Sequence, residues 1–227
     1  ILIGLVGSEM CIRDRDILET MKARHSVRQY KNQAIESSKR EKINALIKDV
    51  NAESKLSIQV FYDEPKCFDS FMAHYGKFEN VKNYIAIVGN KNDQEKAGYY
   101  GEKIVLKCQK LGLNTCWVAM THGKSKAQIK RGQKLLIIIS LGYGETQGVP
   151  HKSKSIAELG QADQKNEWFE KGMEAVSLAP TAVNQQKFYF ELKNGIVTAK
   201  NLGGFYSRID LGIVKYHFEA VTGHEVK

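Results

Sequence analysis

The chain has 227 residues, of which 42% are hydrophobic and 26% charged, values that are ordinary for a soluble globular protein. This length suits one large domain or two small ones, each able to bury a core. The formal net charge is +9, but the lysines are spread along the chain and form no dense basic block with interleaved aromatic residues. We therefore expect no nucleic-acid partner.

The cysteines and histidines do not have the spacing of a metal site or a disulfide framework. Cys11, Cys67, Cys108 and Cys116 form no C-x-x-C pair, and the six histidines form neither H-x-H nor H-E-x-x-H. Cys108 falls on an apolar helical face and Cys116 in an apolar strand-like run. We expect buried thiols in a reducing compartment, and no metal.

Residues 1–15 look unrelated to the rest of the chain. Ile1–Val6 is too short to span a membrane and lacks the basic flank of a signal peptide. Residues 7–15 resemble the translation of a sequencing-library adapter. We therefore expect residues 1–15 to be a non-native stub in place of the true start, and we expect a cytoplasmic protein with no membrane partner.

Hydrophobic periodicity predicts a mixture of helices and strands in the remaining chain. Apolar residues at helical spacing predict helices over 16–23, 37–50, 94–111, 168–178 and 209–221. Apolar runs, alternating or continuous, predict strands over 56–61, 81–88, 115–120, 135–141, 187–192 and 196–200. Lys193-Asn194-Gly195 is a strong hairpin signal between the last two strands. Little regular structure is expected between 142 and 167, and the pattern as a whole is that of an α+β fold.

Two of the predicted helices resemble one another weakly. Tyr99–Leu106 and Asp210–Phe218 each contain an early glycine, Gly101 and Gly212, which would permit close helix packing. The two segments could be two copies of one central helix. By periodicity alone, chance similarity explains them equally well.

A cluster of cations and a hydroxyl follows the first predicted helix. In Arg24-His25-Ser26-Val27-Arg28 two arginines flank a serine, and the planar guanidinium of arginine is well suited to holding a phosphate. Lys152 and Lys154 could join Arg24 around such an anion. Taken alone, each of these groups is explained at least as well by a solvated basic surface.

A second polar segment lies near the C-terminus, after the helix predicted over 168–178. In Ala179–Gln186 the proline ends the helix, small residues allow the backbone to approach a flat ligand, and Thr181 and Asn184 offer short hydrogen-bonding side chains. A plain helix-to-strand turn explains Pro180 equally well. The glycine-rich run Gly142–Gly148 resembles a dinucleotide-binding loop, but no helix is predicted directly after it, so we do not expect a Rossmann site.

Taken together, these segments resemble the nitroreductase family from about residue 16 to the end. The closest likeness is to its single-chain branch, in which one polypeptide carries two nitroreductase-like halves. The resemblance implies a nitroreductase-like α+β fold with antiparallel-rich central sheets flanked by helices. It also implies a first half over 16–155 and a shorter second half over 156–227, which together form an intramolecular pseudo-dimer with one flavin mononucleotide (FMN) site.

The resemblance also implies roles for individual residues. Arg24 and Ser26 would hold the FMN phosphate with Lys152 and Lys154, His25 would contribute backbone, and Arg28 would lie near the pyrimidine oxygens of the flavin. Val118, Ala119 and Met120 match the segment whose backbone passes the reactive nitrogen of the flavin. The strip that the partner subunit supplies in two-chain relatives matches Pro180, Thr181, Ala182 and Asn184. The flavin itself performs the chemistry in this family, so no catalytic side chain is expected.

The implied function is an FMN-dependent oxidoreductase that passes hydride from NADH or NADPH to a nitroaromatic, a quinone or a similar small acceptor. A flavin-binding carrier or sensor without steady turnover is the alternative, because the motifs specify the flavin and no substrate. A basic protein associated with nucleic acid is a third possibility. We expect a monomer or a weak homodimer, since an internal pseudo-dimer removes the usual reason to pair.

Overall fold

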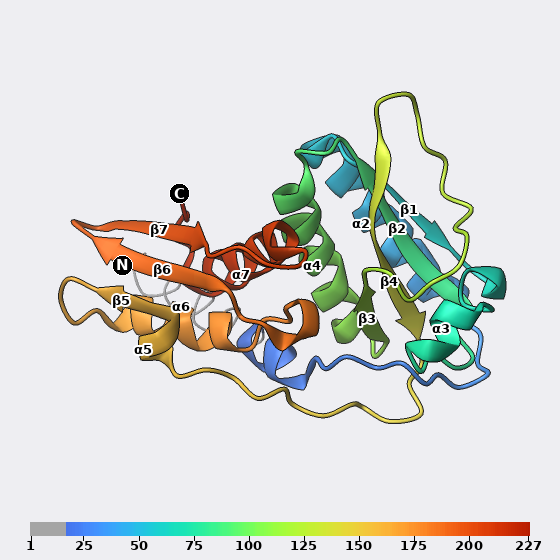
Figure 1. Ribbon diagram of the computed structural model, residues 1–227. Coiled ribbons are helices and arrows are strands. Elements are labelled where there is room, and N and C mark those ends of the chain that lie inside the picture. Colours follow the sequence, from blue (N-terminus) through green and yellow to red (C-terminus); the bar gives the residue numbers. More distant parts are fainter. Residues whose placement is uncertain (1–16) are drawn as a thin grey trace, which may run out of the picture.

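The structure, a computed structural model, describes residues 17–227, so the predicted stub over 1–15 lies outside the described residues (Figure 1). Two separate sheets lie at the two ends of the molecule, with helices between them. The larger sheet has the order β1-β2-β4-β3, and all of its strands pair antiparallel. Its strands are β1 (Ser57–Phe61), β2 (Asn83–Gly89), β3 (Asn114–Val118) and β4 (Lys134–Gly142).

The smaller sheet belongs to the C-terminal third of the chain. It has the order β5-β6-β7 and consists of β5 (Gly160–Ala162), β6 (Phe188–Lys193) and β7 (Ile196–Asn201). β6 and β7 form a hairpin in which Asn194 and Gly195 both have positive φ, as a tight two-residue turn requires. β5 pairs parallel to β6.

Helices fill the space between the sheets and cover their faces. Residues 17–23 are helical. The longer helices are α2 (Ser37–Ser54), α4 (Gln94–Lys110), α6 (Glu167–Ser177) and α7 (Ser207–Thr222). The shorter ones are η1 (Pro65–Cys67), α3 (Phe71–Tyr75), α5 (Ile156–Leu159) and η2 (Ala182–Asn184). Every residue of β2 is buried, because the larger sheet is covered on both faces.

α4 and α7 pack directly against each other at the centre of the molecule (Figure 1). A methyl group on Gly98 would overlap the carbonyl oxygen of Ile209, and one on Gly212 would overlap the carbonyl oxygen of Glu95. Each glycine therefore faces the carbonyl group three residues before the other glycine, so the contact between the two helices is reciprocal. Gly101, the glycine singled out in the sequence, is not at this crossing: a methyl group there would overlap the ring of Trp117.

Two extended segments lie side by side along one edge of the molecule, at the bottom of Figure 1. The segment after the first helix bonds to the chain that leaves β4: Glu145 N donates to Gln29 O at 3.0 Å, and Lys31 N donates to Tyr143 O at 2.8 Å. Farther along, Gly148 has a φ of +72° and lies against His25. The segment after β4 therefore leads from the larger sheet to the smaller one along residues 25–31.

The predicted α+β class is confirmed, and each predicted helix and strand is present, with ends that differ by a few residues. Regular structure between 142 and 167 is sparse, as expected, but it includes α5 and β5, which the sequence did not predict. Both are too short to show a hydrophobic period, and β5 exists through its pairing with β6. In residues 17–227 no helix has the length and hydrophobicity needed to span a membrane. The division into halves at about 155 stays a prediction.

The close approach of α4 and α7 predicts that alanine at either central glycine destabilises the protein. Gly98→Ala and Gly212→Ala place a methyl group against rigid backbone, so each is expected to lower the free energy of unfolding by about 3 kcal/mol or more. Urea unfolding measures the loss. Lys96→Ala on the same turn of α4 is the control, because it removes only an exposed ion pair to Asp93 worth less than about 1 kcal/mol. Glycine variants as stable as Lys96→Ala would contradict the packing.

Candidate functional site

One cavity lies where the first and last thirds of the chain meet. It has a volume of about 490 Å³, within the range of small-molecule sites. Its walls come from the segment at 26–28, the end of β3 and the residues after it, the 180–183 segment and the first turns of α7. We call it the central pocket. A larger hollow of about 740 Å³, beside the C-terminal turns of α4 and α7, is lined by none of the residues predicted for the site.

Ser26 and Arg28 reach the pocket because their segment runs along the free edge of the larger sheet. Ser26 forms a parallel bridge with Thr115 of β3, and Val27 N donates to Thr115 O at 3.0 Å. Successive side chains of an extended segment point in opposite directions. Val27 is therefore buried in the core, while Ser26 and Arg28 line the pocket.

The opposite wall is the segment over 180–186, which has an unusual backbone. Val183, Asn184 and Gln186 have φ values of 47°, 54° and 46°, in the left-handed region that non-glycine residues rarely adopt. Gln186 N donates to the Thr181 hydroxyl at 3.1 Å, which closes the turn from inside. The strained conformation persists because neighbouring segments hold it.

Asp210, in the first turn of α7, holds this segment from one side. Its Oδ1 accepts from Ala182 N at 3.0 Å and its Oδ2 from Gln185 Nε2 at 2.7 Å. The side chain lines the central pocket, and the residue is 4% exposed. Burial raises the pKa of Asp210 to about 6, although the two hydrogen bonds act in the opposite direction.

The segment over 152–154 holds the strained turn from the other side. Asn184 Nδ2 and Gln186 Nε2 both donate to Lys152 O at 2.9 Å. Lys154 N donates to Gln186 Oε1 at 2.8 Å, and Lys154 Nζ donates to Gln186 O at 3.1 Å. Asn184 therefore secures the backbone of Lys152.

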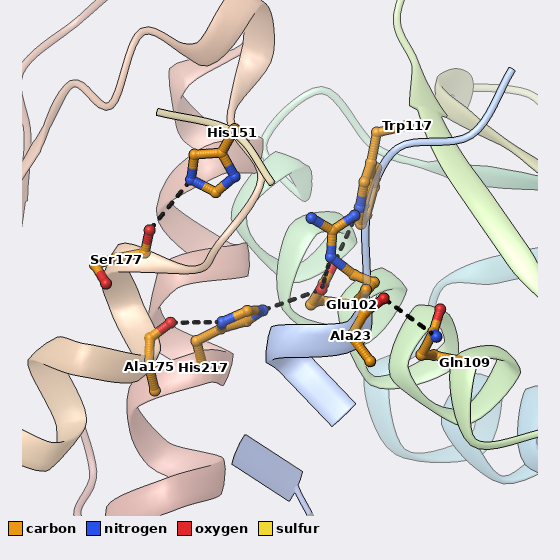
Figure 2. Close-up of polar contacts among 9 residues, drawn as sticks. Ala23, Glu102, Gln109, Trp117, His151, Ala175, Ser177 and His217 are labelled. Carbon is orange, nitrogen blue, oxygen red and sulfur yellow. Dashed lines mark hydrogen bonds and ion pairs between the residues drawn. The ribbon is translucent and has the colours of Figure 1, made fainter. Parts of the chain in front are cut away.

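Arg24 lies deeper, in a buried group of charged side chains. Its Nε is 3.8 Å from Glu102 Oε1, and its Nε and Nη1 atoms are buried without a hydrogen-bond partner. Glu102 also accepts from Trp117 Nε1 at 2.9 Å and lies 3.0 Å from His217 Nε2 (Figure 2). The other nitrogen of His217, Nδ1, is 2.8 Å from Ala175 O, so each ring nitrogen faces an oxygen acceptor.

The charges of this group shift the ionisation of its neighbours. Burial alone would raise the pKa of Glu102, but the hydrogen bond with His217 and the charges of His217 and Arg24 lower it below its usual value. His151, whose Nε2 lies 3.2 Å from Ser177 O (Figure 2), has its pKa lowered by burial and then by the charges of Arg24, His25 and His217. The charge of Arg24 therefore acts on the ionisation of both Glu102 and His151.

The structure brings some of the predicted residues to the pocket and leaves others outside its lining. Those that line it are Ser26, Arg28, Ala119, Pro180, Thr181 and Ala182. Arg24 is in the buried charged group behind it, His25 lies against Gly148, and Val118 points into the core. Lys152, Lys154 and Asn184 lie together at the outer side of the 180–186 segment.

Sequence reasoning did not predict Glu102, Asp210 and His217, which organise this region. The available signal was a charged or polar residue at a buried helical position: Glu102 follows Gly101 on the inner face of α4, and Asp210 and His217 lie on the inner face of α7. The sequence also did not predict Tyr75 and Phe205, whose exposed side chains line the pocket mouth together with exposed Met120 and Val183.

The raised pKa of Asp210 predicts a pH dependence of stability. Because its pKa is near 6 in the folded protein and 3.8 in the reference state, the folded protein binds the extra proton between these values. The contribution of Asp210 is therefore most favourable below pH 3.8 and is lost as the pH rises to about 6. Asp210→Asn removes this decline, so its free energy of unfolding, measured with urea, should fall less between pH 4 and pH 6.5 than that of the wild type. Exposed Asp49→Asn should keep the wild-type slope, and identical slopes in all three would contradict the burial of this carboxyl.

The chain matches a known protein family in sequence and solved structures in fold. Residues 16–222 match the model of the family described as "Putative TM nitroreductase". No curated protein matches the sequence. The chain is similar to the crystal structure of a nitroreductase-type protein from Thermotoga maritima, with a TM-score of 0.65, 23% identity, and coverage of 90% of this chain and 82% of that one.

A second solved structure is similar over a shorter span. It is a nitroreductase-type protein from Desulfovibrio desulfuricans in complex with FMN, with a TM-score of 0.50, 15% identity, and coverage of 63% of this chain and 93% of that one. At these identities the likeness of the structures concerns the fold. The match of the family model extends over nearly the whole described chain, and this chain therefore belongs to the nitroreductase family.

Proposed function

We propose that the protein binds FMN in the central pocket and uses it to pass hydride from NADH or NADPH to a small electron acceptor. The observation that carries the proposal is the meeting of Ser26 and Arg28 with the segment at 180–182 around one cavity in a nitroreductase-family chain. The FMN bound to the structurally similar Desulfovibrio protein supports the choice of cofactor.

The residues beside the pocket fit a phosphorylated flavin. Arg24 has two buried donor atoms, Nε and Nη1, without a hydrogen-bond partner, and Glu102 Oε1 is 3.8 Å from Nε. Buried donors without partners cost free energy, and a phosphate oxygen would satisfy them. The hydroxyl of Ser26 lies at the pocket itself. A phosphate placed between Arg24 and Ser26 would accept hydrogen bonds from both residues.

On this proposal the residues of the two walls would contact different parts of FMN. Arg24 and Ser26 hold the phosphate, with Lys152 and Lys154 contributing positive charge from the outer side. Arg28 would lie near the pyrimidine oxygens, while Ala119 and the segment over 180–182 would enclose the ring system. The flavin would supply the redox chemistry, and the protein would supply orientation and charge.

The pocket mouth supports a flat, apolar acceptor. Tyr75, Met120, Val183 and Phe205 line the pocket and are 75%, 56%, 83% and 44% exposed. Exposed apolar side chains gathered at a cavity favour binding of an aromatic molecule. A nitroaromatic or a quinone has this shape. We further propose a monomer or weak homodimer in the cytoplasm, where the buried thiols of Cys67, Cys108 and Cys116 would stay reduced.

Removal of the phosphate contacts should weaken FMN binding. Arg24→Ala removes charged donors and is expected to raise the dissociation constant for FMN at least about tenfold, with a smaller rise for Ser26→Ala. Flavin fluorescence during titration of the cofactor-free protein measures both. Arg40→Ala, which removes a surface arginine bound to Asp63, should bind FMN as the wild type does. Wild-type affinity in both site variants would contradict the proposed phosphate site.

Turnover separates an enzyme from a flavin carrier or sensor. The FMN-loaded protein should oxidise NADH or NADPH steadily when a nitroaromatic or quinone is present, followed as the loss of nicotinamide absorbance. A yellow protein that shows no steady oxidation with any of these acceptors would favour the carrier or sensor. Protein that is colourless and takes up no added FMN would contradict both flavin functions.

A further inference from the structure

We propose that Asp210 is a positioning residue: its carboxylate holds the 180–186 segment in the conformation that receives FMN. The proposal rests on the FMN site proposed above. It assigns the role to a residue of α7 that acts through the backbone of Ala182 and the side chain of Gln185.

The segment needs such a support because its own backbone does not favour this shape. Three non-glycine residues within four positions have left-handed φ angles, and one of them, Val183, is β-branched. Each costs of order 1 kcal/mol or more, so an unsupported segment would relax to another conformation. Relaxation would move Thr181 and Ala182 from the pocket wall that they now form.

Asp210 contacts the segment at two separate points of the strained turn. The bond to Ala182 N fixes the residue just before Val183, and the bond to Gln185 fixes the residue just after Asn184. Gln185 Nε2 also donates to Phe205 O at 2.6 Å, which ties the turn to the residues that precede α7. Two of the three left-handed residues, Val183 and Asn184, therefore lie between two points that are held by one carboxylate.

The chemistry of Asp210 points to a role beyond stability. Both hydrogen bonds come from neutral amides, and the residue is 4% exposed. A buried carboxylate held only by neutral donors is less favourable than a neutral side chain of the same shape. Asp210 therefore makes the folded chain less stable than a neutral side chain would. Its two carboxylate oxygens each accept one hydrogen bond, whereas an amide side chain has only one such oxygen.

Asp210→Asn separates the contribution of Asp210 to stability from its contribution to the position of the 180–186 segment. The carbonyl oxygen of the asparagine can still accept from Ala182 N, but its amino group would face the amino group of Gln185. The buried charge is removed and one of the two supports is lost. Gln185→Leu removes the same support from the other side, together with the bond to Phe205 O.

The test compares FMN affinity with the stability of the cofactor-free protein at pH 8. Asp210→Asn and Gln185→Leu are each expected to raise the dissociation constant for FMN about tenfold, as loss of one such hydrogen bond implies. The double variant should bind no more weakly than Gln185→Leu alone, because Gln185→Leu already removes the bond to Asp210. The melting temperature of cofactor-free Asp210→Asn should be no lower than that of the wild type.

Glu219→Gln is the matched control. Glu219 is a carboxylate of the same helix that accepts from Tyr99 OH at 2.6 Å and from Val226 N at 2.9 Å, away from the central pocket. It should leave FMN affinity unchanged. Wild-type affinity in Asp210→Asn, additive effects in the double variant, or weaker binding that accompanies a lower melting temperature would each overturn the positioning role. A wild-type protein that binds no FMN would instead contradict the proposed function itself.

Discussion

The crossing of α4 and α7 is the constraint on which the rest of this structure depends. Gly98 and Gly212 let the two helices approach until each glycine meets the backbone of the other helix. A residue with a larger side chain at either position would force the helices apart. Each helix carries, on its inner face, a carboxylate that organises one wall of the central pocket: Glu102 on α4 and Asp210 on α7.

The two carboxylates connect the distant ends of the chain. Glu102 lies beside Arg24 from the N-terminal segment and beside His217 of α7, 115 positions away. Asp210 holds the segment that follows α6. The N-terminal motif and the C-terminal motif therefore meet because both are fastened to the same pair of helices. In this way one chain assembles a pocket from two separated segments.

The sequence predicts the elements well where a long hydrophobic period or a specific turn is present. The apolar stripe of α4, the left-handed Gly112 after it and the Asn194-Gly195 hairpin are local features, and the structure contains all three. α5 and β5 were not predicted because four- and three-residue elements show no period of their own. Of the two glycines predicted to permit close helix packing, Gly212 is at the crossing of α4 and α7. The glycine opposite it is Gly98 and not the predicted Gly101.

The candidate site was predicted less completely, for a physical reason. Ser26 and Thr181 belong to segments with recognisable motifs, and their approach could be expected from a family resemblance. Asp210 and Glu102 have no motif, and their importance comes from what packs around them in three dimensions. The bond of His217 to Glu102 depends on the register of α7 against α4, and the bond of Ala182 to Asp210 depends on how the 180–186 segment packs on α7, neither of which local pattern determines.

The central claim is that two remote segments of one chain form a single flavin pocket. A crystal structure of the protein grown with FMN tests it most directly. We expect the flavin ring between Ser26 and Ala182, with the phosphate within hydrogen-bonding distance of Arg24, all within one chain. Flavin bound elsewhere, or held by residues of two different copies of the chain, would contradict the account.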